Sequence, residues 1–165
     1  MFLEIAFIQK FTLLLGHPIY AVSTALTGFL VFAGLGSIHS KRFSQHGRQL
    51  LPWIAASIGI IGVLYLMLLP QLFTPMQQLP QAGKILFCLL LIAPPAFLMG
   101  MPFPIGLTSL GQQASTLTPW AWGINGCTSV IGAILAVLLA VEIGFSGLVL
   151  TAIGGYLFAA LSLPE

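Results

Sequence analysis

Residues 18–38 read PIYAVSTALTGFLVFAGLGSI, a run of twenty-one residues without a charged side chain. A helix needs about 20 apolar residues to cross the hydrocarbon core of a bilayer, which is roughly 30 Å thick. The whole chain shares this character, because 58% of its 165 residues are hydrophobic and only 5% are charged. An ordinary soluble domain has about 25% charged residues. The sequence therefore predicts an all-α polytopic membrane protein, a helix bundle with lipid as its solvent.

Apolar runs on either side of this stretch predict further transmembrane helices, about six in total. Five are clear, and the one at the start of the chain is short because Glu4 and Lys10 interrupt it. No loop is long enough for a soluble domain, so we expect a single transmembrane domain over residues 1–165. The expected spans are 1–15, 19–38, 52–69, 84–101, 120–141 and 145–163.

The fourth expected span contains an unusual segment, APPAFLMGMPFPIG at residues 93–106. An interior proline removes a backbone donor and clashes with the preceding turn, so adjacent prolines should break this span near its middle. Non-helical backbone at membrane depth is tolerated only where protein covers it or a water-filled cavity adjoins it. Two interpretations stay open, a kink with a re-entrant loop or a binding site like those of transporters. The residues concerned are Pro94, Pro95, Gly100, Pro102 and Pro104.

The orientation follows from the segment 39–50, which holds Lys41, Arg42 and Arg48. Short loops rich in Lys and Arg stay on the cytoplasmic side of a membrane. We therefore expect this loop in the cytoplasm of a bacterial cell, with the chain in the inner (plasma) membrane. An even number of spans then places both termini in the cytoplasm and the uncharged segment 70–83 outside.

Small residues recur every four positions in the last two expected spans. In lipid, such ridges let helix backbones approach closely, and van der Waals contact drives the association. The simplest expectation is that the fifth and sixth spans pack on each other, and a surface for another chain is the alternative. The ridges are Gly132, Ala136 and Ala140, and Gly147, Thr151, Gly155 and Ala159.

A few polar side chains lie in or beside the apolar runs. An ionisable group at the bilayer centre costs at least about 2.5 kcal/mol, so it needs a partner or water. These residues could form a proton or cation site, or they could be structural contacts between helices. For the single asparagine, contact with a substrate is the alternative to a hydrogen bond between helices. The candidates are Glu4, Gln9, Lys10, His17, Asn125 and Glu142.

Groups for catalysis and metal binding are scarce. Aspartate is absent and only three glutamates occur, so paired-carboxylate catalysis has almost nothing to work with. The three histidines are too far apart in the sequence to show metal-ligand spacing. A net charge of +2 without a basic run interleaved with aromatics argues against a nucleic-acid partner. We therefore expect no catalytic residue and no metal site, and the sequence indicates no particular cofactor.

Four strings are distinctive in combination: EIAFIQKFTLLLGHPIYA at 4–21, GLGS at 34–37, MGMPFPIGL at 99–107 and PWAWGINGCTSVIGAILA at 119–136. In this order they resemble the C-terminal membrane region of bacterial spermidine-synthase-like integral membrane proteins. The resemblance covers nearly the whole chain and implies a membrane module. Larger members carry a preceding soluble domain of aminopropyltransferase type, which this chain lacks, so the resemblance implies no such activity here. The matching positions are Glu4, Gln9, Gly16, His17, Pro18, Pro102, Pro104, Trp120, Asn125 and Gly126.

Two functions are compatible with these features. The first is a non-catalytic accessory or anchoring subunit of a larger membrane complex, which binds other membrane subunits or a second copy as well as lipid. Small size, glycine ridges and few polar groups favour it. The alternative is a transporter-like module for a small cationic solute such as a polyamine, favoured by the broken span and Glu4. An enzymatic role would require a partner to supply the catalytic groups.

Overall fold

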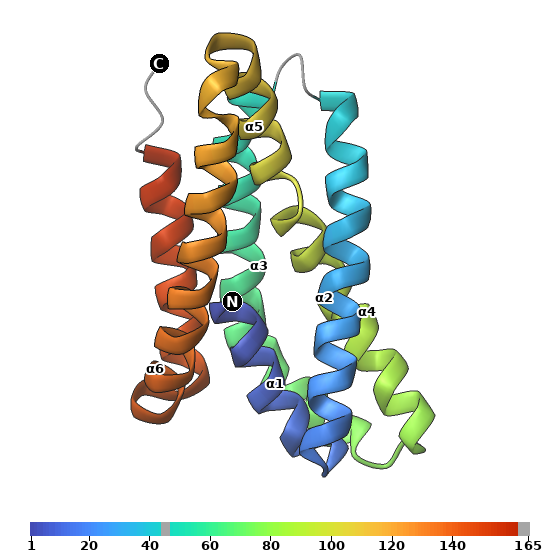
Figure 1. Ribbon diagram of the computed structural model, residues 1–165. Coiled ribbons are helices and arrows are strands. Elements are labelled where there is room, and N and C mark those ends of the chain that lie inside the picture. Colours follow the sequence, from blue (N-terminus) through green and yellow to red (C-terminus); the bar gives the residue numbers. More distant parts are fainter. Residues whose placement is uncertain (44–46, 162–165) are drawn as a thin grey trace.

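The computed structural model describes residues 1–43 and 47–161, and this part of the chain is all-helical, with no strand (Figure 1). This confirms the predicted all-α class. The α-helices are α1 (Phe2–Leu15), α2 (Pro18–Ser40), α3 (Gly47–Met76), α4 (Gln81–Met99), α5 (Pro102–Gln113) and α6 (Thr118–Leu161), with short 3-10 helices η1 (Lys41–Phe43) and η2 (Ser115–Leu117).

Four helical stretches of the described residues are long and apolar enough to cross a membrane, so the expected count of six is not supported. α1 has 14 residues, which makes about 21 Å of helix and falls short of the roughly 30 Å hydrocarbon core. The expected fifth and sixth spans are joined in α6, of which Thr118–Ala159 forms one of the four. The four stretches are Pro18–Phe43, Gln49–Met76, Gln81–Gln112 and Thr118–Ala159.

α6 reverses direction at Gly144, at the lower end of the bundle in Figure 1. The backbone there has φ 62° and ψ −165°, a conformation that is accessible essentially only to glycine. We call residues 118–143 the first arm of α6 and residues 145–161 the second arm. The last two positions of the expected sixth span, Ser162 and Leu163, lie outside the described residues.

Prolines interrupt the helices less than expected. The structure does not support a break at Pro94 and Pro95, because α4 continues through both to Met99. Pro95 has no N–H to bond the carbonyl of Leu91 in the usual helical pattern. The hydroxyl of Tyr65 in α3 donates to that carbonyl instead, at 2.7 Å. A neighbouring helix thus supplies the missing donor, which is how proline is tolerated in membrane helices.

One further boundary differs from the prediction. Pro70, which was expected to end the third span, lies inside α3, and this helix continues to Met76. α4 gives way to α5 at Gly100–Met101, and Pro102 then begins α5 at a first-turn position where its missing N–H costs nothing. Figure 1 places this change of helix near the middle of the bundle's height.

Glycines set the closest helix approach, which is between α2 and α4. A Cβ built on Gly36 would collide with the carbonyl oxygen of Phe97, and one built on Gly100 would collide with that of Ala33. Gly28 lies against the side chain of Ile92 two turns below Gly36. Small residues at these positions let the two backbones touch, which is the usual way helices associate in lipid.

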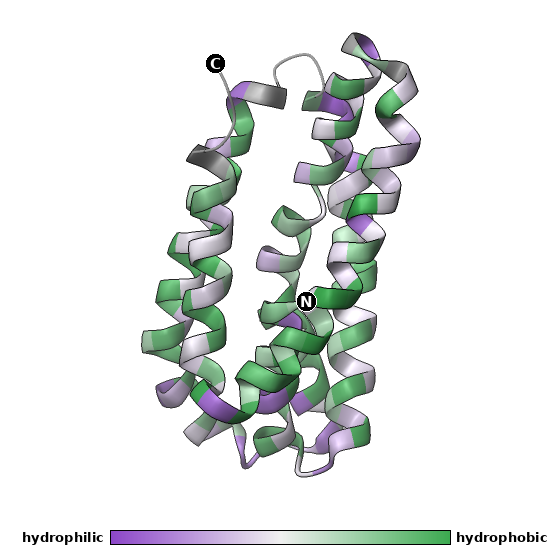
Figure 2. Cartoon of the chain, turned by 60° about the vertical axis from the view of Figure 1, so that its left-hand side comes forward, coloured by the Kyte–Doolittle hydropathy of each residue, from purple (hydrophilic) through white to green (hydrophobic). Residues whose placement is uncertain are grey.

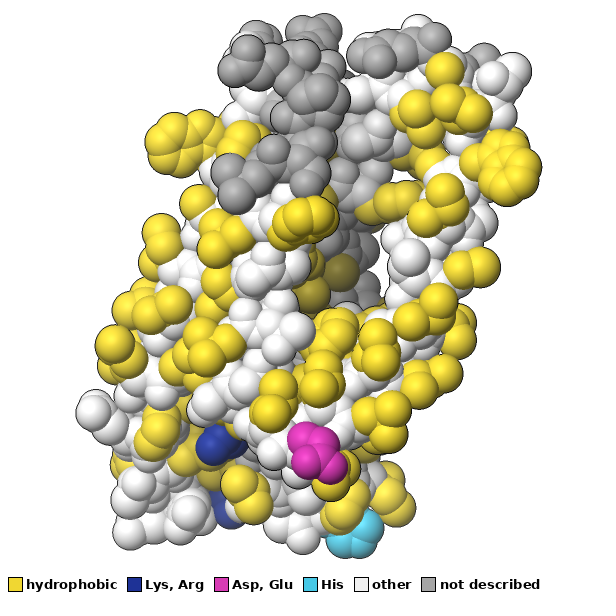
Figure 3. Space-filling view, turned by 90° about the vertical axis from the view of Figure 1, so that its left-hand side faces the viewer, with side chains coloured by type: hydrophobic (Ala, Val, Ile, Leu, Met, Phe, Trp, Pro, Cys, Tyr) yellow, Lys and Arg dark blue, Asp and Glu magenta, His cyan; other side chains and the backbone are white. Residues whose placement is uncertain are grey.

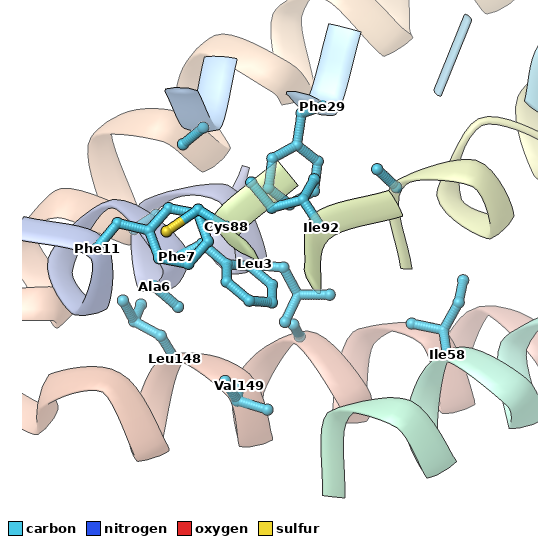
Figure 4. Close-up of a cluster of buried hydrophobic side chains, with 14 of the residues drawn as sticks. Leu3, Ala6, Phe7, Phe11, Phe29, Ile58, Cys88, Ile92, Leu148 and Val149 are labelled. Carbon is cyan, nitrogen blue, oxygen red and sulfur yellow. The ribbon is translucent and has the colours of Figure 1, made fainter. Parts of the chain in front are cut away.

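The core is a cluster of aromatic and aliphatic side chains contributed by several helices (Figure 4). Phe7 and Phe11 of α1 are 1% and 0% exposed, although α1 has only 14 residues. The ring of Phe7 also meets the rings of Phe29 and Tyr65, with centroids 5.9 and 5.7 Å apart. α1 therefore serves as the packing centre on which α2, α4 and α6 converge.

The outer surface is apolar along the helices, and hydrophilic residues gather mostly towards the two ends (Figure 2). Lys41 and Arg42 follow α2 at the upper end of Figure 1, where α6 also ends. The first residue lies at mid-height (Figures 1 and 2). These features are compatible with a membrane location. The expectation that both termini lie in the cytoplasm stays a prediction.

Candidate functional site

Two of the polar candidates in α1 hold the turn of α6. The side-chain amide of Gln9 donates to the carbonyl oxygen of Ala140 at 3.0 Å. The ammonium group of Lys10 lies over the ring of Phe145, 5.0 Å from its centroid. Ala140 and Phe145 flank the reversal at Gly144, where the regular helical pattern is interrupted. Both polar side chains of α1 therefore act as structural contacts between helices in this arrangement.

The other charged or titratable candidates do not converge on one site. Glu4 is half-buried in the first turn of α1, and Glu142 is exposed on the first arm of α6. His17 is exposed at the start of α2, where its ring meets that of Tyr20 at 5.8 Å. Within residues 1–43 and 47–161, no group of three His, Cys or Glu side chains could hold a metal ion. These positions therefore form no shared centre in the described part of the chain.

The small-residue ridge of the first arm packs against α1. Ala136 and Ala140 are 0% and 7% exposed, and Gly132 lies beside Met1. α1 and α6 share one of the most extensive contacts of the bundle. Helix α1 therefore covers this ridge, whereas the sequence analysis expected the second arm of α6 to cover it.

The ridge of the second arm faces open space. Gly147 lies against Ile143 at the turn, but Thr151, Gly155 and Ala159 line a cavity. No atom of another residue lies within 4 Å of a Cβ built on Gly155. The expected packing of the two arms through this ridge is therefore not what the structure shows.

This cavity and a second one adjoin each other in the upper half of the bundle, and we call them together the upper hollow. Their volumes are about 440 and 360 Å³, and they meet at Tyr156 and Ala159. Figure 3 looks onto a side of the bundle that is largely apolar and hollowed in its upper half. The first cavity is lined by Met1, Phe2, Leu3, Met99, Thr151, Ala152, Gly155, Tyr156 and Ala159, and the second by Leu51, Ala55, Pro102, Phe103, Gly106, Ala121, Tyr156 and Ala159.

Asn125 lies on the first arm in line with the ridge that packs on α1. Positions 125, 129, 132, 136 and 140 are three or four apart and therefore share one helix face. The lower part of this face is covered by α1, whereas Asn125 is exposed. Its backbone carbonyl accepts hydrogen bonds from Thr128 and Ser129 at 3.1 and 2.7 Å. Its side-chain amide has no hydrogen bond to any residue that the structure describes.

Tyr156 is a site residue that the sequence analysis missed. Its ring lies between the two cavities, and its hydroxyl has no hydrogen bond within residues 1–43 and 47–161. One tyrosine in an apolar span is usually a packing residue, and only the neighbouring ridge of small residues marks this position in the sequence. The upper hollow is thus apolar, with Tyr156 in its wall.

The upper hollow is apolar and is lined in part by small residues. The side chains that line it are all uncharged, so a cationic solute would find no counter-ion among them. Small residues and an unpartnered amide are the features with which membrane helices associate. The described residues therefore form an all-helical protein with four helical stretches long and apolar enough to cross a membrane and with an apolar hollow between its helices.

No protein family, no curated protein and no solved structure matches the chain. The resemblance to the spermidine-synthase-like membrane region therefore stays a prediction. The function has to be argued from the geometry of this chain alone.

Proposed function

We propose that this chain is a small, non-catalytic subunit that anchors or stabilises a larger complex in a bacterial inner membrane. The observation that carries the proposal is the side-chain amide of Asn125, which lies exposed on a helix face that α1 covers only in its lower half. An amide at membrane depth needs a hydrogen-bond partner, and lipid chains offer none. A further membrane segment seated on the upper part of this face would supply one.

The experiment compares two variants of the chain in its own membranes. Asn125→Leu removes the amide, whereas Cys127→Leu changes an exposed residue on the opposite side of the same helix. After gentle extraction, the native mass of the wild type and of Cys127→Leu should exceed that of the isolated chain. Asn125→Leu should shift a measurable fraction to the mass of the free chain. A wild type that always extracts alone, as a monomer, would contradict the proposal.

The alternative is a transporter-like module for a small cationic solute such as a polyamine. The observation that favours it is the change from α4 to α5 at Gly100–Met101, beside a cavity at mid-height. Against it stands the uncharged lining of that cavity, since Glu4 does not belong to it. Glu4→Gln should abolish uptake of a radiolabelled polyamine by vesicles that contain the protein. Uptake that continues unchanged in this variant would remove Glu4 from any such role.

A further inference from the structure

We propose that the upper end of the bundle binds the headgroups of anionic phospholipids through Lys41 and Arg42 of η1. This binding is independent of the subunit role proposed above. Among the side chains that the structure describes, Lys41 and Arg42 are the two exposed cations, whereas Lys10 and Lys84 are half-buried. Neither exposed cation forms an ion pair with a described residue. Both are therefore free to bind an anion from outside the chain.

Lys41 and Arg42 lie at the depth of the lipid headgroups. Helix α2, which precedes them, has 23 residues, and these make about 34 Å of helix, enough to cross the roughly 30 Å hydrocarbon core. Tryptophan marks the same level, because its amphipathic ring prefers the membrane–water interface. All three tryptophans of the chain are exposed. Trp120 and Trp122 lie near the start of α6 and Trp53 near the start of α3, and both helices begin at the upper end with η1 (Figure 1).

The carboxylates of the described residues lie away from η1. Glu142 is exposed, but it comes two residues before the turn at Gly144, at the lower end of the bundle. Glu4 is half-buried in α1, whose first residues lie at mid-height. No described carboxylate therefore neutralises the cations of η1. Arg48, in the first turn of α3, adds a third basic position close to them in the sequence.

Helix η1 is held against the bundle, so its two cations are presented on a fixed backbone. The ring of His39 lies between two aromatic rings, with centroids 5.7 Å from Phe43 of η1 and 5.8 Å from Phe97 of α4. Ser40 is buried, and its hydroxyl donates to the carbonyl oxygen of Ser37 at 2.6 Å. η1 also contacts α5. A backbone that is already ordered loses less conformational entropy when a ligand binds.

The ligand that fits these features is a phospholipid with a net negative charge. The guanidinium of Arg42 has the geometry to donate two parallel hydrogen bonds to a phosphate, and the ammonium of Lys41 binds as a point charge. A zwitterionic lipid also carries a phosphate, but its own ammonium group is repelled by two adjacent cations. Anionic lipids give the cytoplasmic leaflet its negative surface potential, and this is the side on which we expect the segment 39–50.

The experiment measures lipid preference in bilayers by quenching of tryptophan fluorescence. The full chain is reconstituted in mixtures of phosphatidylglycerol and phosphatidylcholine with identical acyl chains, and one of the two lipids is brominated on its chains. Because Trp120 and Trp122 lie at the same end as η1, quenching reports the lipid bound there. The wild type should prefer phosphatidylglycerol at least about tenfold. Raising the salt concentration tenfold should weaken this preference, since exposed charges are screened.

Substitutions then locate the site. Lys41→Gln and Arg42→Gln should each lower the preference about fivefold, the effect of one cation near an anionic surface. The double variant should lose most of the preference. Lys84→Gln is the control, because it removes one charge near the start of α4, at the lower end of the bundle, and it should leave the preference unchanged. Lys41 and Arg42 are exposed, so the thermal midpoint in detergent should be the same in all variants.

Four results would overturn the proposal. The first is equal binding of both lipids by the wild type, and the second is a preference that the double variant retains. The third is an equal loss in Lys84→Gln, which would make the effect one of net charge. The fourth is displacement of phosphatidylglycerol at constant ionic strength, either by inorganic phosphate or by a soluble acidic peptide. Either competitor would then be the class of ligand that η1 takes. The native mass that tests the proposed function is a separate measurement, so each can fail alone.

Discussion

The hydroxyl of Tyr65 lies 2.7 Å from the carbonyl oxygen of Leu91, the carbonyl that Pro95 leaves without its helical donor. This single contact explains why α4 passes through two adjacent prolines without ending. It also ties α3 to α4 at a point where the ring of Tyr65 meets Phe7 of the core.

We predict that Tyr65→Phe destabilises the protein by about 1 kcal/mol, because it leaves a half-buried carbonyl unsatisfied. In a Pro95→Ala background the helix regains its own N–H donor, so the same substitution should cost clearly less. Unfolding in detergent with increasing denaturant measures both values and gives their coupling. Tyr20→Phe, at an exposed tyrosine, is the control. An equal cost of Tyr65→Phe in both backgrounds would show that the hydroxyl does not replace the missing N–H.

The close approach of α2 and α4 predicts a large effect of a single methyl group. Gly36→Ala and Gly100→Ala should each destabilise the protein by at least about 2 kcal/mol, because the new Cβ meets backbone that cannot move aside easily. Gly34→Ala is the matched control, since a Cβ at Gly34 meets nothing within 4 Å. Thermal unfolding in detergent gives the comparison. Equal stability of all three variants would mean that the helices do not cross at these glycines.

The reversal of α6 predicts that glycine is required at position 144. Any other residue there has to adopt φ 62° and ψ −165°, which costs of order 1–3 kcal/mol. We therefore expect Gly144→Ala to lower the thermal midpoint in detergent. Gly126→Ala, in the helical first arm with no atom within 4 Å of the new Cβ, should leave that midpoint unchanged or raise it slightly. If α6 were straight at Gly144, both substitutions would leave the midpoint unchanged or raise it slightly.

The hydrogen bond from Gln9 to Ala140 predicts that α1 holds the turn in place. Gln9→Leu should destabilise the protein by about 1 kcal/mol and increase the rate at which a protease cuts near the turn. Thr12→Val is the control, because the Thr12 hydroxyl bonds only to Ile8 within its own helix. Limited proteolysis followed by mass measurement of the fragments tests this. Identical cutting in both variants would contradict an anchoring role for Gln9.

Apolar runs such as residues 18–38 were enough to predict an all-helical chain with helices long and apolar enough to cross a membrane, because a helix pairs nearly all of its backbone N–H and C=O groups within itself. The expected end of the first span at residue 15 likewise agrees with the end of α1 at Leu15. Gly16 adopts φ 72° there, and Pro18 starts α2. These are local properties, set by composition and by the conformations that single residues allow.

Only the tertiary structure decided what the prolines, the ridges and the polar side chains do. Pro95 fails to break α4 because Tyr65 is nearby in space, and the ridge of the second arm is open because α1 covers the first arm instead. Asn125, already a candidate from the sequence, is left exposed for the same reason, since its helix face is covered below and free above. Such outcomes depend on which helices are neighbours, and that is a property of three-dimensional packing which no spacing along the chain records.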